Sequence, residues 1–185
     1  MNDHDGNVRA NLLASLLMSD ERQRDARANR IMWLSANQFE PGAVMGPAEA
    51  LALRSEARYS FINGHFIGAV LLAMAFVEQT LVTDLLDRDL TNDVELRSSD
   101  ALKLAAAHAV FDDNMLARAK QMADRRNAYA HLKSPEHKQS FADRFFAAQT
   151  HPDLIREQDA KDALVLMDDY FRATLKAGDQ EDWTG

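Results

Sequence analysis

The most hydrophobic stretch of the chain, residues 66–77, reads FIGAVLLAMAFV. The polar residues Asn63 and His65 precede it and Glu78 follows it. The stretch is shorter than the roughly 18 to 20 apolar residues that a membrane-spanning helix needs. We therefore expect residues 64–86 to form a buried core helix of the fold.

The composition is typical of a folded, helical protein. Of the 185 residues, 46% are hydrophobic and 27% are charged, which suits one globular domain with an additional arm. Only 7 glycines and 4 prolines are present. Apolar residues recur at helical spacing, and no stretch alternates apolar and polar residues over the length of a strand. The sequence therefore predicts an all-α fold.

Helix-breaking residues in FEPGAVMGP, residues 39–47, separate the N-terminal part of the chain from the rest. Helical spacing predicts helices at residues 8–18, 20–37, 47–64, 64–86, 98–111, 112–132, 135–149 and 154–177. We expect an N-terminal helical arm over residues 1–46, a helical bundle over 47–177 and a flexible tail over 178–185. The arm packs either on the bundle or on a partner, and both alternatives stay open.

Charge and cysteine content restrict the class of protein. The N-terminus lacks the pattern of a signal peptide. With no cysteine in the chain, disulfides and cysteine-ligated zinc are excluded, and the reducing cytoplasm is the expected location, away from any membrane. The net charge of −8 argues against a broad basic surface that wraps nucleic acid, although it leaves room for a local basic cleft.

Most motifs that carry chemistry are absent from the sequence. It holds no phosphate-binding glycine loop, no dinucleotide fingerprint and no HExxH pair. None of the six histidines is spaced as a metal ligand, so we predict neither a metal nor a cofactor. His65 and His108 lie among apolar neighbours in the sequence and are expected to be packed core histidines.

The stretch RRNAYAHL, residues 125–132, concentrates the polar groups that could perform catalysis. Asn127 and His131 are four residues apart and share a helix face. His131 lies in the last turn of its helix, where an imidazole can act as general base or acid. Arg126 can stabilise the charge on a phosphoryl transition state, and Asn127 can orient the histidine or a phosphate oxygen. This set suits metal-free cleavage of RNA by its own 2′-hydroxyl.

RNAYAH, in which Arg126 is followed by a polar residue and then by His131, resembles the Rx4-6H signature of the HEPN superfamily. The context is also similar, because the motif follows a helical pair with the acidic residue Glu78 in the apolar helix. The resemblance covers residues 47 to about 176. The same pattern also looks something like the mannitol operon repressor family.

The resemblance implies a four- or five-helix bundle that forms a homodimer, with the motifs of two protomers lining one cleft. Many HEPN proteins are ribonucleases of toxin–antitoxin or phage-defence systems. An antitoxin or another protein is then the expected partner, beside RNA. Other members have lost activity and serve as binding or regulatory modules. The second hypothesis is accordingly a non-catalytic interaction module.

Simpler structural roles stand beside each catalytic role. Arg126 and His131 can be a solvated helix end, whose histidine interacts with the helix dipole. Glu78 either orients Arg126 or is a salt-bridge partner of Arg125 or Arg126. Arg125 is the more suitable structural partner of the two arginines. Tyr129 packs in the core or at a dimer contact in preference to stacking on a base.

Overall fold

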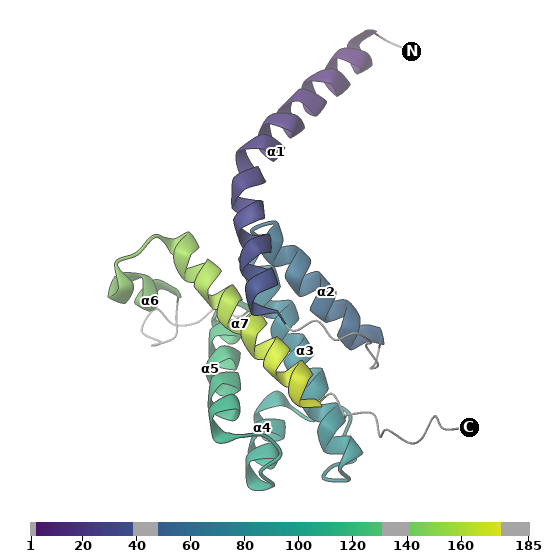
Figure 1. Cartoon of the computed structure of the whole chain (residues 1–185), viewed down its shortest axis with the longest axis vertical. Coiled ribbons are helices and arrows are strands. Elements are labelled where there is room, and N and C mark those ends of the chain that lie inside the picture. The colour runs from purple at the N-terminus through teal and green to yellow at the C-terminus, as the bar shows by residue number, and fades with distance from the viewer. Residues whose placement is uncertain (1–2, 39–47, 131–140, 175–185) are drawn as a thin grey trace, which may run out of the picture. The chain divides into compact units, whose positions relative to one another are not determined.

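The computed structural model describes residues 3–38, 48–130 and 141–174. These residues form helices without any strand, which confirms the all-α fold (Figure 1). The helices are α1 (Asp3–Asn37), α2 (Ala48–Ile62), α3 (Phe66–Asp87), α4 (Ser98–Ala107), α5 (Asp113–Ala130), α6 (Phe141–Ala148) and α7 (Pro152–Thr174). Contacts divide the chain into two units, Met1–Asn37 and Gln38–Gly185.

The first unit consists of the single helix α1, which is 35 residues long. The prediction of separate helices at residues 8–18 and 20–37 is therefore wrong. Ser19 and Asp20 lie at the predicted break and are residues that favour helix starts, but neither glycine nor proline follows Gly6 before residue 38, so nothing breaks the backbone ladder. The expected boundary of the arm at residue 46 lies outside the described residues.

Helix α3 lies at the centre of the second unit, in contact with α2, α4, α5 and α7. Its apolar residues are spaced so that more than one face of the helix is covered by neighbours. The buried set is Ala69, Val70, Ala73, Met74, Phe76, Val77, Leu81, Asp84 and Leu85. The expectation that residues 64–86 form a core helix is confirmed.

In length and composition α3 would also suit a membrane span. Among the described residues it is the one helix that does so, with 22 residues and a mean hydropathy of 1.8 over its most apolar 18 residues. The helix continues past Val77 to Asp87, so the short length of residues 66–77 does not by itself exclude a membrane span. Its buried residues nonetheless pack against other helices of the chain.

A tight turn joins α2 to α3 and makes them antiparallel neighbours. Gly64 has a φ of 79°, a conformation that glycine adopts without steric cost. The backbone N–H groups of Gly64 and His65 donate to the carbonyls of Phe61 and Ser60. His65 itself is exposed, at the position just before α3.

The prediction that His65 and His108 are packed core residues is wrong. His108 follows the last residue of α4 and is exposed as well. Next to it, Ala109 has a φ of 49°, which ends the helix before the predicted residue 111. Both histidines have apolar neighbours in the sequence, but helix ends turn them to solvent.

The remaining helices extend over the predicted ranges with small shifts. Helix α5 corresponds to the prediction at 112–132, and α7 to the prediction at 154–177. Helix α6 begins at Phe141 within the described residues, and the predicted start at residue 135 lies outside them, as does the tail at 178–185.

Two aspartates of α7 carry buried or half-buried ion pairs between helices. Asp168 accepts from the Nε of Arg54 at 3.0 Å and from the Nη2 of Arg58 at 3.3 Å, which ties α2 to α7. The Arg54 guanidinium also lies 4.4 Å from the centre of the Phe171 ring, a cation–π distance. Asp169 accepts from Arg118 of α5 at 2.6 Å.

Candidate functional site at the end of helix α5

The motif residues described by the structure lie in the last turns of α5. The inner face of this helix buries Met115, Leu116, Ala119 and Met122. Beyond Met122, the side chains of residues 125–129 are half-buried, so their polar ends meet both protein and solvent. His131, the proposed general base or acid, lies outside the described residues.

Arg126 is held by Glu78 of α3. Its Nη2 donates to the Glu78 Oε1, and the two side chains expose 24% and 27% of their surface. The same Oε1 accepts from the Ser98 hydroxyl at 3.0 Å. One carboxylate therefore links α3, α4 and α5, and it fixes where the guanidinium of Arg126 points.

Part of the Arg126 guanidinium has no partner in the described structure. Its Nε is buried and donates to no group among the residues that the structure describes. An unsatisfied buried donor is costly, so such a group commonly has a structural or functional explanation. The Nε of Arg125 is likewise buried without a partner among the described residues, so both arginines of the motif share this feature.

Arg125 points to a different carboxylate from Arg126. Its Nη1 donates to Asp159 at 3.1 Å and to Asp162 at 2.7 Å, both on α7. The same nitrogen lies 3.6 Å from the sulfur of Met122. Gln158 donates to the other oxygen of Asp162 at 2.8 Å. Arg125 thus joins α5 to α7 through ion pairs. Of the two arginines, Glu78 pairs with Arg126 and not with Arg125.

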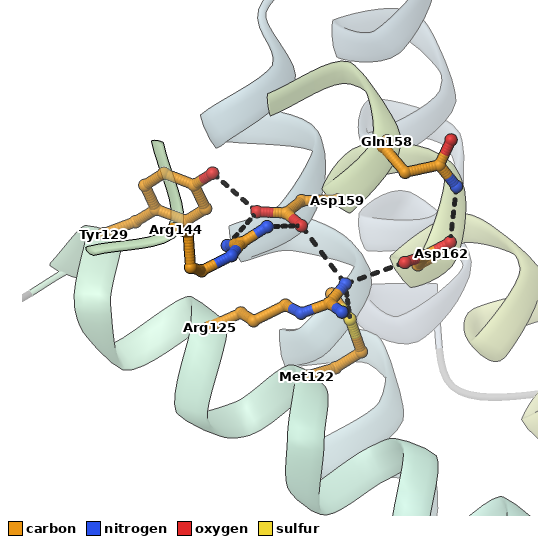
Figure 2. A network of polar contacts seen from close by, with 7 residues as sticks. All are labelled: Met122, Arg125, Tyr129, Arg144, Gln158, Asp159 and Asp162. Carbon is orange, nitrogen blue, oxygen red and sulfur yellow. Dashed lines mark hydrogen bonds and ion pairs between the residues drawn. The ribbon is translucent and has the colours of Figure 1, made fainter. Parts of the chain in front are cut away.

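Asp159 is the centre of a polar network that joins α5, α6 and α7 (Figure 2). Figure 2 shows its carboxylate between the side chains of Arg144 and Arg125. Arg144 of α6 donates through both terminal nitrogens, at 2.6 and 2.5 Å, and the Tyr129 hydroxyl donates at 2.7 Å. The Asp159 side chain is completely buried, so its negative charge depends on these partners.

Tyr129 has a structural place in this network. Its ring lies 6.3 Å from the ring of Phe141, centre to centre, at an angle of 44°. Burial, and next the hydrogen bond to Asp159, raise the pKa of Tyr129 well above its ordinary value of 10.0. The phenol therefore stays protonated and donates to the carboxylate. Its hydroxyl is occupied within the fold.

The network around Asp159 was missed by sequence reasoning. Asp159 and Arg144 are separated from Arg125 by 34 and 19 residues, so neither belongs to the motif. A signal was nonetheless present. Asp159 lies four residues after the buried Ile155 and four before the buried Ala163, which is the apolar face of α7. A charged residue on such a face requires partners of opposite charge.

Asn127, the third proposed catalytic residue, is half-buried. Within the described ranges no hydrogen bond of its side chain is found. Helical geometry places it one position after Arg126, so the two side chains point in different directions around α5. Of the proposed set, the structure therefore brings Arg126 to Glu78, and the Asn127 amide makes no hydrogen bond to the described residues.

A pocket of about 280 Å³ lies between α5 and α7, next to the start of the motif. Its walls are Arg118, Gln121, Met122, Asp162 and Val165. Neither Arg126 nor Asn127 lines it, although two of its wall residues, Met122 and Asp162, contact Arg125 of the motif.

The basic residues in and around the motif are Arg118, Lys120, Arg125, Arg126, Lys133 and Lys138. Paired carboxylates neutralise the three arginines among them. Arg118, Arg125 and Arg126 each form an ion pair with an acidic residue. Lys120 is exposed, and Lys133 and Lys138 lie outside the described residues.

The likeness to HEPN proteins rests on the motif and its helical context, since no protein-family model, no curated protein and no solved structure matches the chain.

Proposed function

We propose that the protein is a HEPN-type, metal-independent endoribonuclease that acts as a cytoplasmic homodimer. The observation that carries this proposal is the Arg126 guanidinium at the end of α5, which Glu78 holds in place while 24% of the side chain stays exposed. An arginine that is held in place and partly exposed is suited to bind a phosphate or its transition state.

The proposed reaction divides the roles among three residues of the motif. His131 takes the proton from the 2′-hydroxyl or gives one to the leaving 5′-oxygen. Arg126 stabilises the negative charge of the phosphorane, and Asn127 orients the substrate or the histidine. Attack by the 2′-oxygen breaks the bond to the 5′-oxygen, so the products are a 2′,3′-cyclic phosphate and a 5′-hydroxyl.

Arg125 and Tyr129 have supporting roles in this proposal. Their contacts with Asp159 fix the last turns of α5, and with them the direction of Arg126. Positioning of this kind is effective only if the supporting groups are themselves held by packing and hydrogen bonds. A second copy of the chain supplies the other half of the cleft, as in the proteins that the motif resembles.

Cleavage of single-stranded RNA by the purified full chain in the presence of EDTA tests the proposal. We expect products with a 2′,3′-cyclic phosphate, and loss of cleavage by a factor of about 100 or more for His131→Ala and for Arg126→Ala. Arg118→Ala is the matched control, because this arginine lies on the same helix but pairs with Asp169. Equal cleavage by His131→Ala and wild type, or cleavage that needs added metal, would contradict the mechanism.

A second function is a non-catalytic interaction or regulatory module. It is favoured by the pairing of Arg118, Arg125 and Arg126 with carboxylates in a chain of net charge −8, so that these three arginines add no net positive charge near the motif. Expression in bacteria separates the two functions. A toxic wild type relieved by Arg126→Ala supports the nuclease and an antitoxin partner. Equal tolerance of both supports the module.

A further inference from the structure

The N-terminal half of α1 presents an exposed apolar surface. Leu12, Leu13, Leu16 and Leu17 each expose more than half of their surface, from 52% to 69%. Single exposed leucines are common on proteins, but a contiguous group of them on one helix marks an interaction surface. These four leucines lie within the first unit, so their exposure concerns α1 by itself.

The leucines follow a regular line along the helix. Arg9, Leu13, Leu16 and Asp20 are spaced by four, three and four residues, which is the heptad spacing of helices that pair side by side. Leu12 and Leu17 flank this line. The line therefore has a leucine centre, a positive charge at one end and a negative charge at the other.

We propose that α1 pairs with α1 of a second copy of this chain, in antiparallel orientation. A two-fold axis between residues 14 and 15 brings Leu13 against Leu16 of the partner subunit, and the reverse contact follows from the symmetry. The same axis brings Arg9 against Asp20 of the partner subunit at both ends. One position of the axis satisfies the leucines and the charges together.

Charge complementarity favours a second copy of α1 as the partner helix and favours the antiparallel orientation of the two helices. In a parallel pair Arg9 would face the partner's Arg9, and Asp20 the partner's Asp20, which repels at both ends. Asp20 also accepts a hydrogen bond from Arg27 of its own helix at 3.4 Å. A carboxylate has acceptor sites for a second donor, and the Asp20 side chain is 62% exposed. The pairing is independent of the proposed nuclease function, since no residue of the motif takes part in it.

Sedimentation of the full chain tests the charge contacts. We expect Arg9→Glu or Asp20→Arg to weaken self-association by about tenfold or more, because each creates two facing like charges. The double variant with both changes restores opposite charges and should associate like the wild type. Arg22→Glu and Asp25→Arg are matched controls, since these exposed charges lie on the other side of α1 and should leave association unchanged. Circular dichroism verifies that every variant keeps its helix content.

Disulfide formation tests the direction of the pair, because the chain has no cysteine of its own. A mixture of Arg9→Cys and Asp20→Cys chains should form mixed disulfide dimers. Arg9→Cys alone should not, since its two copies would lie about 16 Å apart along the antiparallel helices, beyond the reach of roughly 7 Å between α-carbons.

Several outcomes would overturn the pairing. They are a monomeric wild type, single reversals that associate like the wild type, a double variant that stays weak, or disulfides within the Arg9→Cys chain alone. A dimer that survives both single reversals without mixed disulfides would likewise refute it, while leaving the motif-lined dimer of the proposed nuclease intact. If the wild type cleaves no RNA while the Arg9→Cys and Asp20→Cys chains still form mixed disulfides, the nuclease is refuted and this pairing is not.

Discussion

Arg144 and Asp159 form a two-bond contact between guanidinium and carboxylate, with nitrogen–oxygen distances of 2.6 and 2.5 Å. This contact ties α6 to α7 at a carboxylate that is completely buried. Helix α6 buries no residue of its own among those described. Its attachment to the bundle therefore depends on polar contacts to an unusual degree.

Replacement of Asp159 should destabilise the bundle strongly. Asp159→Asn removes the charge that Arg125 and Arg144 share and leaves both guanidiniums partly buried, so we expect the free energy of unfolding to fall by about 3 kcal/mol. Urea unfolding followed by circular dichroism measures the change. Asp162→Asn is the control, because its side chain is 39% exposed and its loss should cost about 1 kcal/mol or less. Equal effects of the two changes would contradict the central place of Asp159.

Replacement of two consecutive aspartates of α7 should likewise lower the free energy of unfolding by unequal amounts. Asp168 is almost fully buried between Arg54 and Arg58, whereas Asp169 pairs with Arg118 near the surface. We expect Asp168→Asn to lower the free energy of unfolding by about 3 kcal/mol and Asp169→Asn by about 1 kcal/mol or less. Denaturant midpoints of the two variants, measured side by side, decide the order. A larger effect at Asp169 would show that the buried triad is weak.

Stability should fall in alkaline solution because of two tyrosines. Burial raises the pKa of Tyr129 and Tyr170 above the ordinary value of 10.0, with the Asp159 hydrogen bond and the Asp112 charge as the next causes. The folded state thus holds the neutral phenols, so their stabilisation is complete below pH 10 and is lost as the pH rises above it, by up to about 1.4 kcal/mol per pH unit for each tyrosine.

The alkaline dependence is measurable in urea unfolding between pH 9 and about pH 11.5. Tyr129→Phe and Tyr170→Phe should each reduce the slope, and the double variant should reduce it most. Because lysines also lose their charge over this range, the difference between variant and wild type is the quantity to compare. Identical slopes would show that neither phenol controls the dependence.

Glu78→Gln separates orientation of Arg126 from simple ion pairing. If Glu78 positions Arg126 for RNA cleavage, kcat should fall roughly tenfold with KM little changed. The same change should lower the free energy of unfolding by only about 1 kcal/mol, as both side chains are partly exposed. Ser98→Ala removes the other contact of Glu78 and serves as the control for stability alone. Unchanged cleavage with reduced stability would make Glu78 a structural partner.

Much of the fold could be predicted because its helices are encoded locally. The apolar run that begins at Phe66 and the breakers around Gly64 define α3 and its turn without reference to the rest of the chain. The continuity of α1 was missed because Ser19 and Asp20 favour helix starts, although they are tolerated inside a helix whose neighbours form helix well.

The candidate site could be predicted only in part. The two arginines of the motif are adjacent in the sequence, yet they bind carboxylates on different helices, Arg126 to Glu78 and Arg125 to Asp159. Which carboxylate each one reaches depends on the rotation of α5 between α3 and α7. Periodicity gives the inner face of a helix but not the partner that a polar residue on that face will meet.

The Asp159 network also bears on the order of folding. Its contacts come from the end of α5, the start of α6 and the middle of α7, so the carboxylate is fully paired only after all three helices have docked. We expect these contacts to form after the main folding barrier, when α3 has already gathered its apolar neighbours. Contacts of that kind slow unfolding and leave the folding rate nearly unchanged. Asp159 is therefore expected to control how long the native state persists before it unfolds.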